Sequence, residues 1–207
     1  SLFKPYTNQD LIKKLAHHKV TSISLEMIPR ISRAQAMDVL SSQSNLAGYK
    51  AVVDAASEYG RAMPLMMTAA GTIAPARVLV IGAGVAGLQA IATARRMGSI
   101  VSAFDVRAAA KEQVESLGAS FVEVSSTEAG EGVGGYAKEM SDDYKQRQSE
   151  KLAEVIKTQD IIITTAQIPG KKAPVLVTAD MVKSMKPGSI IVDLAVETGG
   201  NCELSEF

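Results

Sequence analysis

A short apolar run that ends in a glycine-rich turn constrains the fold of this chain more than any other feature. Val78–Ile81 contains β-branched and aliphatic residues only, which predicts a buried strand. A helical pattern over 85–97 follows it and ends at Gly98. Between the strand and the helix lies a G-x-G-x-x-G spacing, Gly82-Ala83-Gly84-Val85-Ala86-Gly87. A strand that turns into a helix over such glycines is typical of an α/β layer.

The same alternation continues to the end of the chain. Further strands are predicted over 100–104, 121–124, 160–165 and 189–194, and further helices over 108–117, 144–157 and 178–185. Residues 125–142 read as a long, glycine-rich and acidic loop. The order strand, helix, strand predicts an α/β fold, with a Rossmann-like parallel sheet and helices on both faces.

The region before residue 77 has a different pattern. We expect a short helix over 11–19, a strand over Val20–Met27, a long helix from Ser32 to about Gly60, and an apolar connector over 63–76. Ser32 and Gln35 have the spacing of a capping box for the long helix. Its predicted apolar stripe contains Val39, Leu46, Tyr49, Val53 and Ala56. Gly48 lies inside this helix at a cost of about 1 kcal/mol against alanine, which indicates close packing.

Composition excludes several classes of protein. The chain has 207 residues, 46% of them apolar, a net charge of +0, two histidines and one cysteine. No basic field attracts nucleic acid, and a His/Cys zinc site is not expected. Cys202 cannot form an internal disulfide and no activating base is visible near it, so we interpret it as structural and expect a reducing compartment. The uncharged run 78–94 is too short and glycine-rich for a membrane span.

The glycine turn predicts a dinucleotide site. Gly82 permits a tight turn, Gly84 admits a pyrophosphate to the backbone, and Gly87 lets the helix pack closely on the strand. Asp105 ends the next strand, 18 residues beyond Gly87, and is placed to accept hydrogen bonds from an adenosine ribose. It would repel a 2′-phosphate, which favours NAD over NADP, although Arg107 could neutralise it and admit NADP. In the alternative interpretation the turn only packs a helix and Asp105 is solvated.

A second candidate cluster precedes the Rossmann-like region. Arg30, Gln35, Asp38 and Ser41 have spacings that place them near one side of a helix start. Such a group offers the donor and the acceptor that a nicotinamide carboxamide needs. Capping explains the same residues equally well, since Gln35 can complete a capping box and Asp38 favours the positive end of a helix.

The sequence offers no obvious general acid. His17 and His18 precede the predicted strand and are expected at the surface. Most dehydrogenases that reduce a carbonyl need such an acid, whereas direct transfer of hydride between two nicotinamide rings needs positioning and the exclusion of water.

The chain resembles the NAD(H)-binding domain of the proton-translocating NAD(P) transhydrogenases. The resemblance covers essentially the whole chain and is carried by PRISRAQAMDVLSSQSNLAGYKA (29–51), VLVIGAGVAGLQA (78–90), FDVRAAAKEQVESLGA (104–119), GGYAKEM (134–140), TTAQIPGKKAPVL (164–176) and GSIIVDLAVETGGNC (188–202). It implies NAD(H) as the cofactor of this chain. It also implies that hydride passes to NADP(H) on a partner domain, coupled to proton flow through a membrane domain.

The resemblance also implies roles for individual residues. Arg30, Gln35, Asp38 and Ser41 would lie at the nicotinamide end, with Gln35 reaching toward the partner's NADP(H). The dinucleotide site would include Gly84, Val85, Asp105, Val106 and Arg107. Residues 125–142 would form a mobile flap whose Gly135 and Tyr136 close over NAD(H), and Gln148 and residue 167 would line the site. The family usually has leucine where this chain has Gln167.

The same resemblance implies how the chain is organised. Residues 1–62 would hold the end of a first α/β subdomain with its connecting helix, 63–76 a connector, and 77–207 an NAD(H)-binding subdomain that is incomplete at its C-terminus. Ser1 is not a start methionine, which fits a fragment. The family is usually dimeric, and its soluble domain lies on the cytoplasmic face of a bacterial inner membrane or the matrix face of the mitochondrial one.

Two other functions stay open at this point. An alanine dehydrogenase would need a substrate-binding lysine and an acid histidine upstream, and Ser1 to Thr7 contain no histidine. A non-catalytic NAD-sensing module would bind NADH without hydride exchange.

Overall fold

A computed structural model of the chain describes residues 2–124, 140–168 and 171–207. The chain divides into two compact units, Ser1–Ser44 and Asn45–Phe207, which are described separately below. Among the described residues, no helix combines the length and the apolar character that crossing a membrane requires.

The first unit contains short helical segments. They are α1 (Gln9–His17), the 3-10 helices η1 (Leu25–Met27) and η2 (Ser32–Met37), and the beginning of α2 (Val39–Glu58). The strand predicted over Val20–Met27 is therefore wrong. A strand needs a hydrogen-bonded neighbour, and the described residues of this unit contain no other strand. Instead, the Glu26 carboxylate accepts the backbone N–H groups of Phe3 and Lys4, at 2.7 and 2.5 Å.

The long helix starts later than the predicted capping box. Ser32 and Gln35 lie in η2, where no side chain caps the first turn. The cap of α2 is Asp38, whose carboxylate accepts the Ser41 amide at 2.9 Å and the Ser41 hydroxyl at 2.6 Å. An aspartate three residues before a serine is also a favourable cap, and this local competition moves the helix start by seven residues, from 32 to Val39.

The second unit is built on a five-stranded parallel sheet. Its strands are β3 (Arg77–Ile81), β4 (Ile100–Phe104), β5 (Ser120–Phe121), β6 (Ile161–Thr164) and β7 (Ile190–Asp193). They lie in the order β5-β4-β3-β6-β7, so β3 is central and pairs with β4 on one side and β6 on the other. This confirms the predicted Rossmann-like sheet, with strand ends within two residues of those expected except at β5.

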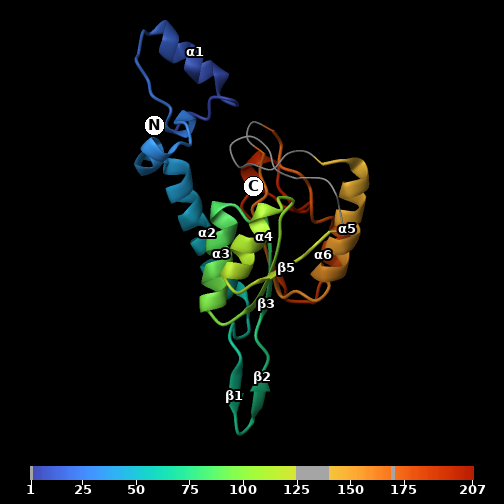
Figure 1. Cartoon of the computed structure of the whole chain (residues 1–207). Coiled ribbons are helices and arrows are strands. Elements are labelled where there is room, and N and C mark those ends of the chain that lie inside the picture. The colour runs from blue at the N-terminus through green and yellow to red at the C-terminus, as the bar shows by residue number, and fades with distance from the viewer. Residues whose placement is uncertain (1, 125–139, 169–170) are drawn as a thin grey trace. The chain divides into compact units, whose positions relative to one another are not determined.

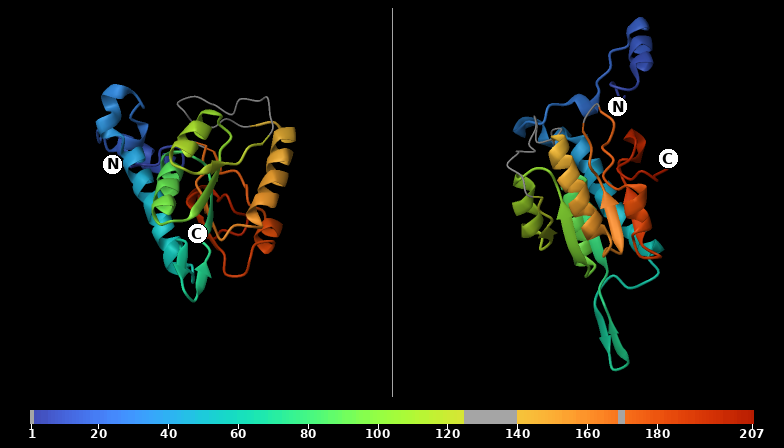
Figure 2. Two further views of the ribbon diagram at one scale, coloured as in Figure 1. Left: turned by 60° about the horizontal axis from the view of Figure 1, so that its bottom comes forward. Right: turned by 90° about the vertical axis from the view of Figure 1, so that its right-hand side faces the viewer.

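Helices cover both faces of this sheet (Figure 1). They are α3 (Val85–Arg96), α4 (Ala109–Ser116), α5 (Asp142–Ile156) and α6 (Ala179–Lys183), besides α2. Alternate residues of β3 point to opposite faces, as a strand requires. Val78 and Val80 belong to the core formed with α2, α3 and α4, whereas Leu79 and Ile81 belong to the core formed with α5 and α6. The sheet therefore separates two apolar cores, as the turned views show (Figure 2).

Helix α2 buries a different face from the one predicted. Leu46 and Tyr49, placed in the apolar stripe, are 57% and 50% exposed. The buried residues of α2 are small or β-branched: Gly48, Ala51, Val52 and Ala55. A Cβ at Gly48 would lie 2.0 Å from the carbonyl oxygen of Ala86 in α3. Small residues thus let α2 approach α3 closely, and this approach outweighs the larger area that Leu46 and Tyr49 could have buried.

A β-hairpin occupies the region predicted as an irregular connector. Strands β1 (Met66–Thr68) and β2 (Gly71–Ile73) pair antiparallel, and every residue of both strands is exposed. The hairpin extends away from the amino end of β3 (Figure 1). Three-residue strands without alternation carry too little periodic signal to be recognised in the sequence.

The α2–α3 contact gives a stability prediction. Gly48→Ala should lower the free energy of unfolding by about 1–3 kcal/mol, since the added methyl meets a backbone carbonyl that cannot move independently. Gly60→Ala is the matched control, because no atom lies within 4 Å of a Cβ there. Urea unfolding should show a change below about 1 kcal/mol for the control. Equal effects of the two substitutions would contradict the packing described for α2.

Candidate functional site

The glycine turn lies at the carboxyl end of β3 and is fixed from both sides. Gly82 has a φ of +100°, which only glycine adopts readily. Its N–H donates to the carbonyl of Phe104, at the end of β4, at 2.8 Å. Its own carbonyl accepts the Thr165 hydroxyl, just beyond β6, at 2.9 Å. The turn is therefore attached to both neighbouring strands.

The other two glycines of the motif meet different surroundings. A Cβ at Gly87 would lie 1.8 Å from the Gly82 carbonyl oxygen, so this position requires the absence of a side chain. Gly84 is the N-cap residue of α3, and nothing lies within 4 Å of the position its Cβ would take. Gly87 thus holds the helix against the turn, while Gly84 leaves open space in front of the first backbone amides of α3. Amides in the first helical turn have no intrahelical acceptor and favour an anion.

Asp105 lies beside the turn and is enclosed by hydrogen-bond donors. Its Oδ2 accepts the Ala83 N–H at 2.7 Å and Nη2 of Arg107 at 2.9 Å. Its Oδ1 accepts the amide N–H and Nε of Arg107, both at 2.9 Å. The side chain of Asp105 is 6% exposed and that of Arg107 is 19% exposed. The alternative in which Asp105 is a solvated carboxylate is therefore wrong.

This arrangement has a consequence for any ribose at Asp105. An ionised carboxylate offers about four lone-pair positions, and four donors already occupy them here. Two of the four come from the Arg107 guanidinium. A ribose diol also presents two hydroxyls, so it fits the place of the guanidinium and would have to displace it.

The hydrophobic neighbours of the turn have separate surroundings. Val85 is the first residue of α3 and is 37% exposed, beside the open space at Gly84. Val106 is half-buried against the core under α5 and α6. Both valines lie next to the residues that the sequence placed at the dinucleotide.

The segment after β6 forms the other side of the turn. Gln167 is exposed, and its side-chain amide lies 3.4 Å from the Leu194 carbonyl at the end of β7. Gln148 lies in α5 on its buried face, with Tyr144, Leu152 and Ile156. Gly135 and Tyr136, together with residues 125–139 of the predicted flap, lie outside the described residues.

Sequence analysis missed a polar cluster at the end of β7. The Asp193 carboxylate accepts five hydrogen bonds, from the hydroxyls of Thr164 and Ser205 and the amides of Ala195, Asn201 and Cys202. Burial acts to raise the pKa of Asp193, but these donors outweigh it and the pKa lies below its ordinary value. The only signal in the sequence was an acid at the end of a strand, Asp193. Cys202 is buried, which confirms its structural interpretation.

The residues predicted for the nicotinamide end lie in the first unit. Asp38 and Ser41 are in direct contact, and the Ser41 hydroxyl and amide lower the pKa of Asp38, with a smaller contribution from the Arg30 charge. Gln35 is exposed in η2, and its carbonyl accepts the Asp38 amide at 3.1 Å. His17 and His18 are exposed, as expected.

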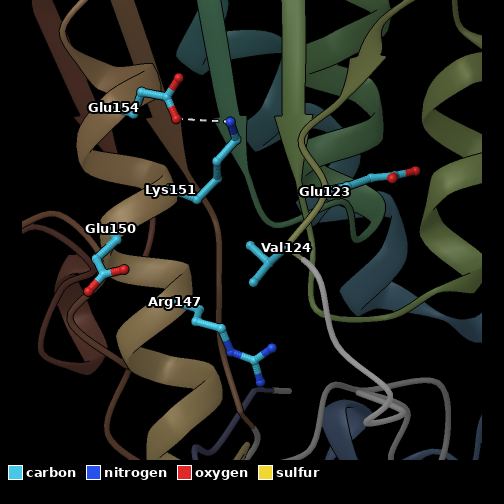
Figure 3. A pocket seen from close by; sticks show the side chains of 6 residues that line it. All are labelled: Glu123, Val124, Arg147, Glu150, Lys151 and Glu154. Carbon is cyan, nitrogen blue, oxygen red and sulfur yellow. Dashed lines mark hydrogen bonds and ion pairs between the residues drawn. The ribbon is translucent and has the colours of Figure 1, made fainter.

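A separate open pocket lies between α5 and the segment that follows β5 (Figure 3). It is lined by Glu123, Val124, Arg147, Glu150, Lys151 and Glu154. Lys151 and Glu154 form an ion pair at 2.9 Å across one turn of α5. None of the predicted site residues lines this pocket. Within residues 2–124, 140–168 and 171–207, no group of three or more His, Cys, Asp or Glu side chains could hold a metal ion.

The fold and the site together define a class of protein. A parallel sheet in the order β5-β4-β3-β6-β7 has its topological switch between β3 and β6, and the glycine turn lies there at the carboxyl edge. This is the position at which doubly wound sheets bind their ligands, so the second unit is a Rossmann-type domain.

Family comparisons agree with this class and refine it. Residues 51–207 match the family "Alanine dehydrogenase/PNT, C-terminal domain", and residues 1–47 match "Alanine dehydrogenase/PNT, N-terminal domain". The chain belongs to the alanine dehydrogenase/PNT family.

Individual relatives point to one branch of that family. An NAD(P) transhydrogenase alpha subunit of Rhodospirillum rubrum is 62% identical over 203 residues, which cover 97% of this chain and 53% of that protein. The crystal structure of transhydrogenase from Sinorhizobium meliloti has 56% identity and a TM-score of 0.87, over 99% of this chain and 55% of that one. A solved L-alanine dehydrogenase has 25% identity and a TM-score of 0.72, over 96% and 50%. The chain thus spans about half the length of these relatives.

The Asp193 cluster predicts a pH dependence of stability. Because the pKa of Asp193 is lowered in the fold, its contribution is present above the ordinary aspartate pKa of about 3.9 and is lost as the pH falls through the folded value. Asp193→Asn should therefore cost about 2–4 kcal/mol of unfolding free energy at pH 7. The difference from the wild type should shrink as the pH falls below about 4. Asp180→Asn, whose side chain is 93% exposed, is the control and should match the wild type. A gap for Asp193→Asn that stays constant across this pH range would contradict the account.

Proposed function

We propose that this chain is the NAD(H)-binding component of a proton-translocating NAD(P) transhydrogenase. The observation that carries the proposal is the glycine turn at the carboxyl edge of β3, with an open approach at Gly84 and Asp105 beside it. The transhydrogenase relatives, at 51–62% identity, are closer to this chain than the alanine dehydrogenase of Methanococcus maripaludis, at 29%. The function of the whole enzyme then extends to this chain as one of its components.

The residues of the second unit would hold the adenosine diphosphate half of the cofactor. The first amides of α3 bind the pyrophosphate, and Asp105 accepts the ribose hydroxyls once the Arg107 guanidinium has moved away. Ala83 keeps Asp105 in place through its N–H donor. When bound, NADH supplies the hydride that passes to NADP⁺ on the partner domain. The chain itself needs no proton donor for that step, only positioning and the exclusion of water.

The nicotinamide end is assigned to residues at the beginning of the chain. Gln35 would position the ring toward the partner's NADP(H), while the Asp38–Ser41 pair and Arg30 would hold the carboxamide. The support is the exposed position of Gln35 and the hydrogen-bonded geometry of Asp38 and Ser41. Gly135, Tyr136, Gln148 and Gln167 complete the proposed site. In this organisation residues 1–62 belong to the first subdomain, 63–76 connect, and 77–207 bind NAD(H).

The proposal includes partners. They are an NADP(H)-binding domain, a membrane domain through which protons flow, and a second copy of this chain. Support for the second copy comes from the β1–β2 hairpin, which exposes Leu65, Met66, Met67 and Ile73. A two-stranded hairpin is marginal in water without a packing partner. It extends from the amino end of β3, so pairing there leaves the glycine turn accessible. The chain would then act on the cytoplasmic or matrix face of its membrane.

The cofactor preference is testable through Asp105. We expect tighter binding of NADH than of NADPH, since Asp105 repels a 2′-phosphate. Asp105→Asn should weaken NADH binding by about tenfold or more and narrow that preference. Arg107→Ala keeps the acid and removes the competing guanidinium, so NADH should bind at least as tightly as to the wild type. Fluorescence titration with both cofactors measures these affinities, and a wild-type preference for NADPH would refute the assignment.

The catalytic assignment is testable through Gln35. Gln35→Asn shortens the side chain by one methylene and should slow hydride transfer by about a hundredfold, with NADH affinity changed by less than about twofold. Ser32→Ala, in the same 3-10 helix, is the matched control. The assay combines the full-length polypeptide with an NADP-binding partner domain and follows reduction of an NADP analogue by NADH.

Three outcomes of this assay decide the function. Equal losses of rate and of affinity would contradict the role of Gln35. NADH binding without any exchange, even with the partner domain present, would favour a non-catalytic sensing module. NADH oxidation with pyruvate and ammonia would identify an alanine dehydrogenase instead.

A further inference from the structure

A fully buried asparagine ties together the segment that follows β6. Asn201 is 0% exposed. Its Oδ1 accepts the Ala166 N–H at 2.9 Å, and its Nδ2 donates to the carbonyls of Ala166 and Pro174, both at 2.8 Å. The backbone of Asn201 is also engaged, because its N–H donates to Asp193 at 2.7 Å and its carbonyl accepts the amides of Leu176 and Val177. One side chain thus joins the start of the segment to a point eight residues further along.

This segment adjoins the glycine turn. Thr165, directly before Ala166, donates its hydroxyl to the Gly82 carbonyl. Thr164, directly before that, donates its hydroxyl to Asp193 at 2.9 Å. A continuous set of hydrogen bonds therefore runs from the turn at β3, through the end of β6, to Asp193 and Asn201 beyond β7.

The position of Asp105 fixes which half of a dinucleotide meets this segment. Asp105 follows β4, on one side of β3, whereas Thr165 and Ala166 follow β6, on the other side. A dinucleotide with its adenosine ribose at Asp105 and its pyrophosphate at α3 continues across β3 toward β6. The residues after β6 therefore face the nicotinamide half.

We infer that Asn201 is a positioning residue that holds the segment after β6 in the conformation needed by the nicotinamide half of the cofactor. The inference rests on the proposed binding of NAD(H). A side chain that supplies one acceptor and two donors fixes the backbone at Ala166 in position and in direction, which apolar packing alone does not do. The described ends of the segment, Thr165–Ile168 and Lys171–Val177, are the stretches that Asn201 holds.

Comparison of two ligands separates positioning from a merely structural role. Asn201→Ala should weaken NADH binding by about tenfold, whereas 5′-AMP, which reaches only the Asp105 side, should keep its affinity within about twofold. Ser205→Ala is the matched control, because it removes one hydrogen bond to Asp193 without touching Ala166 or Pro174. Its affinities for both ligands should equal those of the wild type. Equal losses of NADH and 5′-AMP affinity in Asn201→Ala, or no loss of either, would overturn the inference.

A second measurement on the wild-type chain decides the matter if Asn201→Ala does not fold. Hydrogen exchange should show that NADH increases the protection of amides in 165–168 and 171–177, while 5′-AMP leaves them unchanged. Equal protection by the two ligands, or none by either, would overturn the inference. A wild-type chain that binds 5′-AMP and NADH with equal affinity and equal protection refutes only the role of Asn201. A chain that binds neither ligand refutes the proposed function as well.

Discussion

The attachment of Gly82 to both neighbouring strands is the interaction on which the rest of the second unit depends. Its N–H is held by β4 through Phe104, and its carbonyl is held by Thr165 after β6. The absence of a side chain at Gly87 then brings α3 directly onto this turn. These contacts leave the first amides of α3 and the open face of Gly84 at the carboxyl edge, next to Asp105. A larger residue at position 82 or 87 would displace the anion-binding end of α3 from the sheet.

The residues around the turn form two polar systems on opposite sides of β3. On the β4 side, Asp105 is paired with Arg107, which shields a buried charge and occupies the positions that ribose hydroxyls would take. On the β6 side, Asp193 and Asn201 are saturated by backbone and hydroxyl groups of the protein itself. The first pair can exchange its donors for those of a ligand, whereas the second cannot without loss of structure. Binding is thus expected at the exchangeable pair, and rigidity at the saturated one.

The sequence predicts the parallel sheet well, because each of its strands is a buried run of β-branched residues and each glycine at a helix end has a local role. It predicts the turn and Asp105 for the same reason, since spacing along one chain determines that contact. It fails where the outcome depends on contacts distant in sequence. The buried face of α2 is set by the close approach of Ala86 to Gly48, and Asn201 meets Ala166 across 35 residues. The start of α2 is missed because Asp38 and Ser32 compete as local caps, and the spacing does not rank them.

The central claim is that one adenine dinucleotide is bound by the turn around Gly84 and by Asp105. A crystal structure of the chain with NADH tests it most directly. The account predicts pyrophosphate oxygens on the first amides of α3, ribose hydroxyls on Asp105 with the Arg107 guanidinium displaced, and the nicotinamide half beyond β6. A cofactor bound elsewhere, or an Arg107–Asp105 pair that stays intact while the ribose lies at another residue, would contradict it.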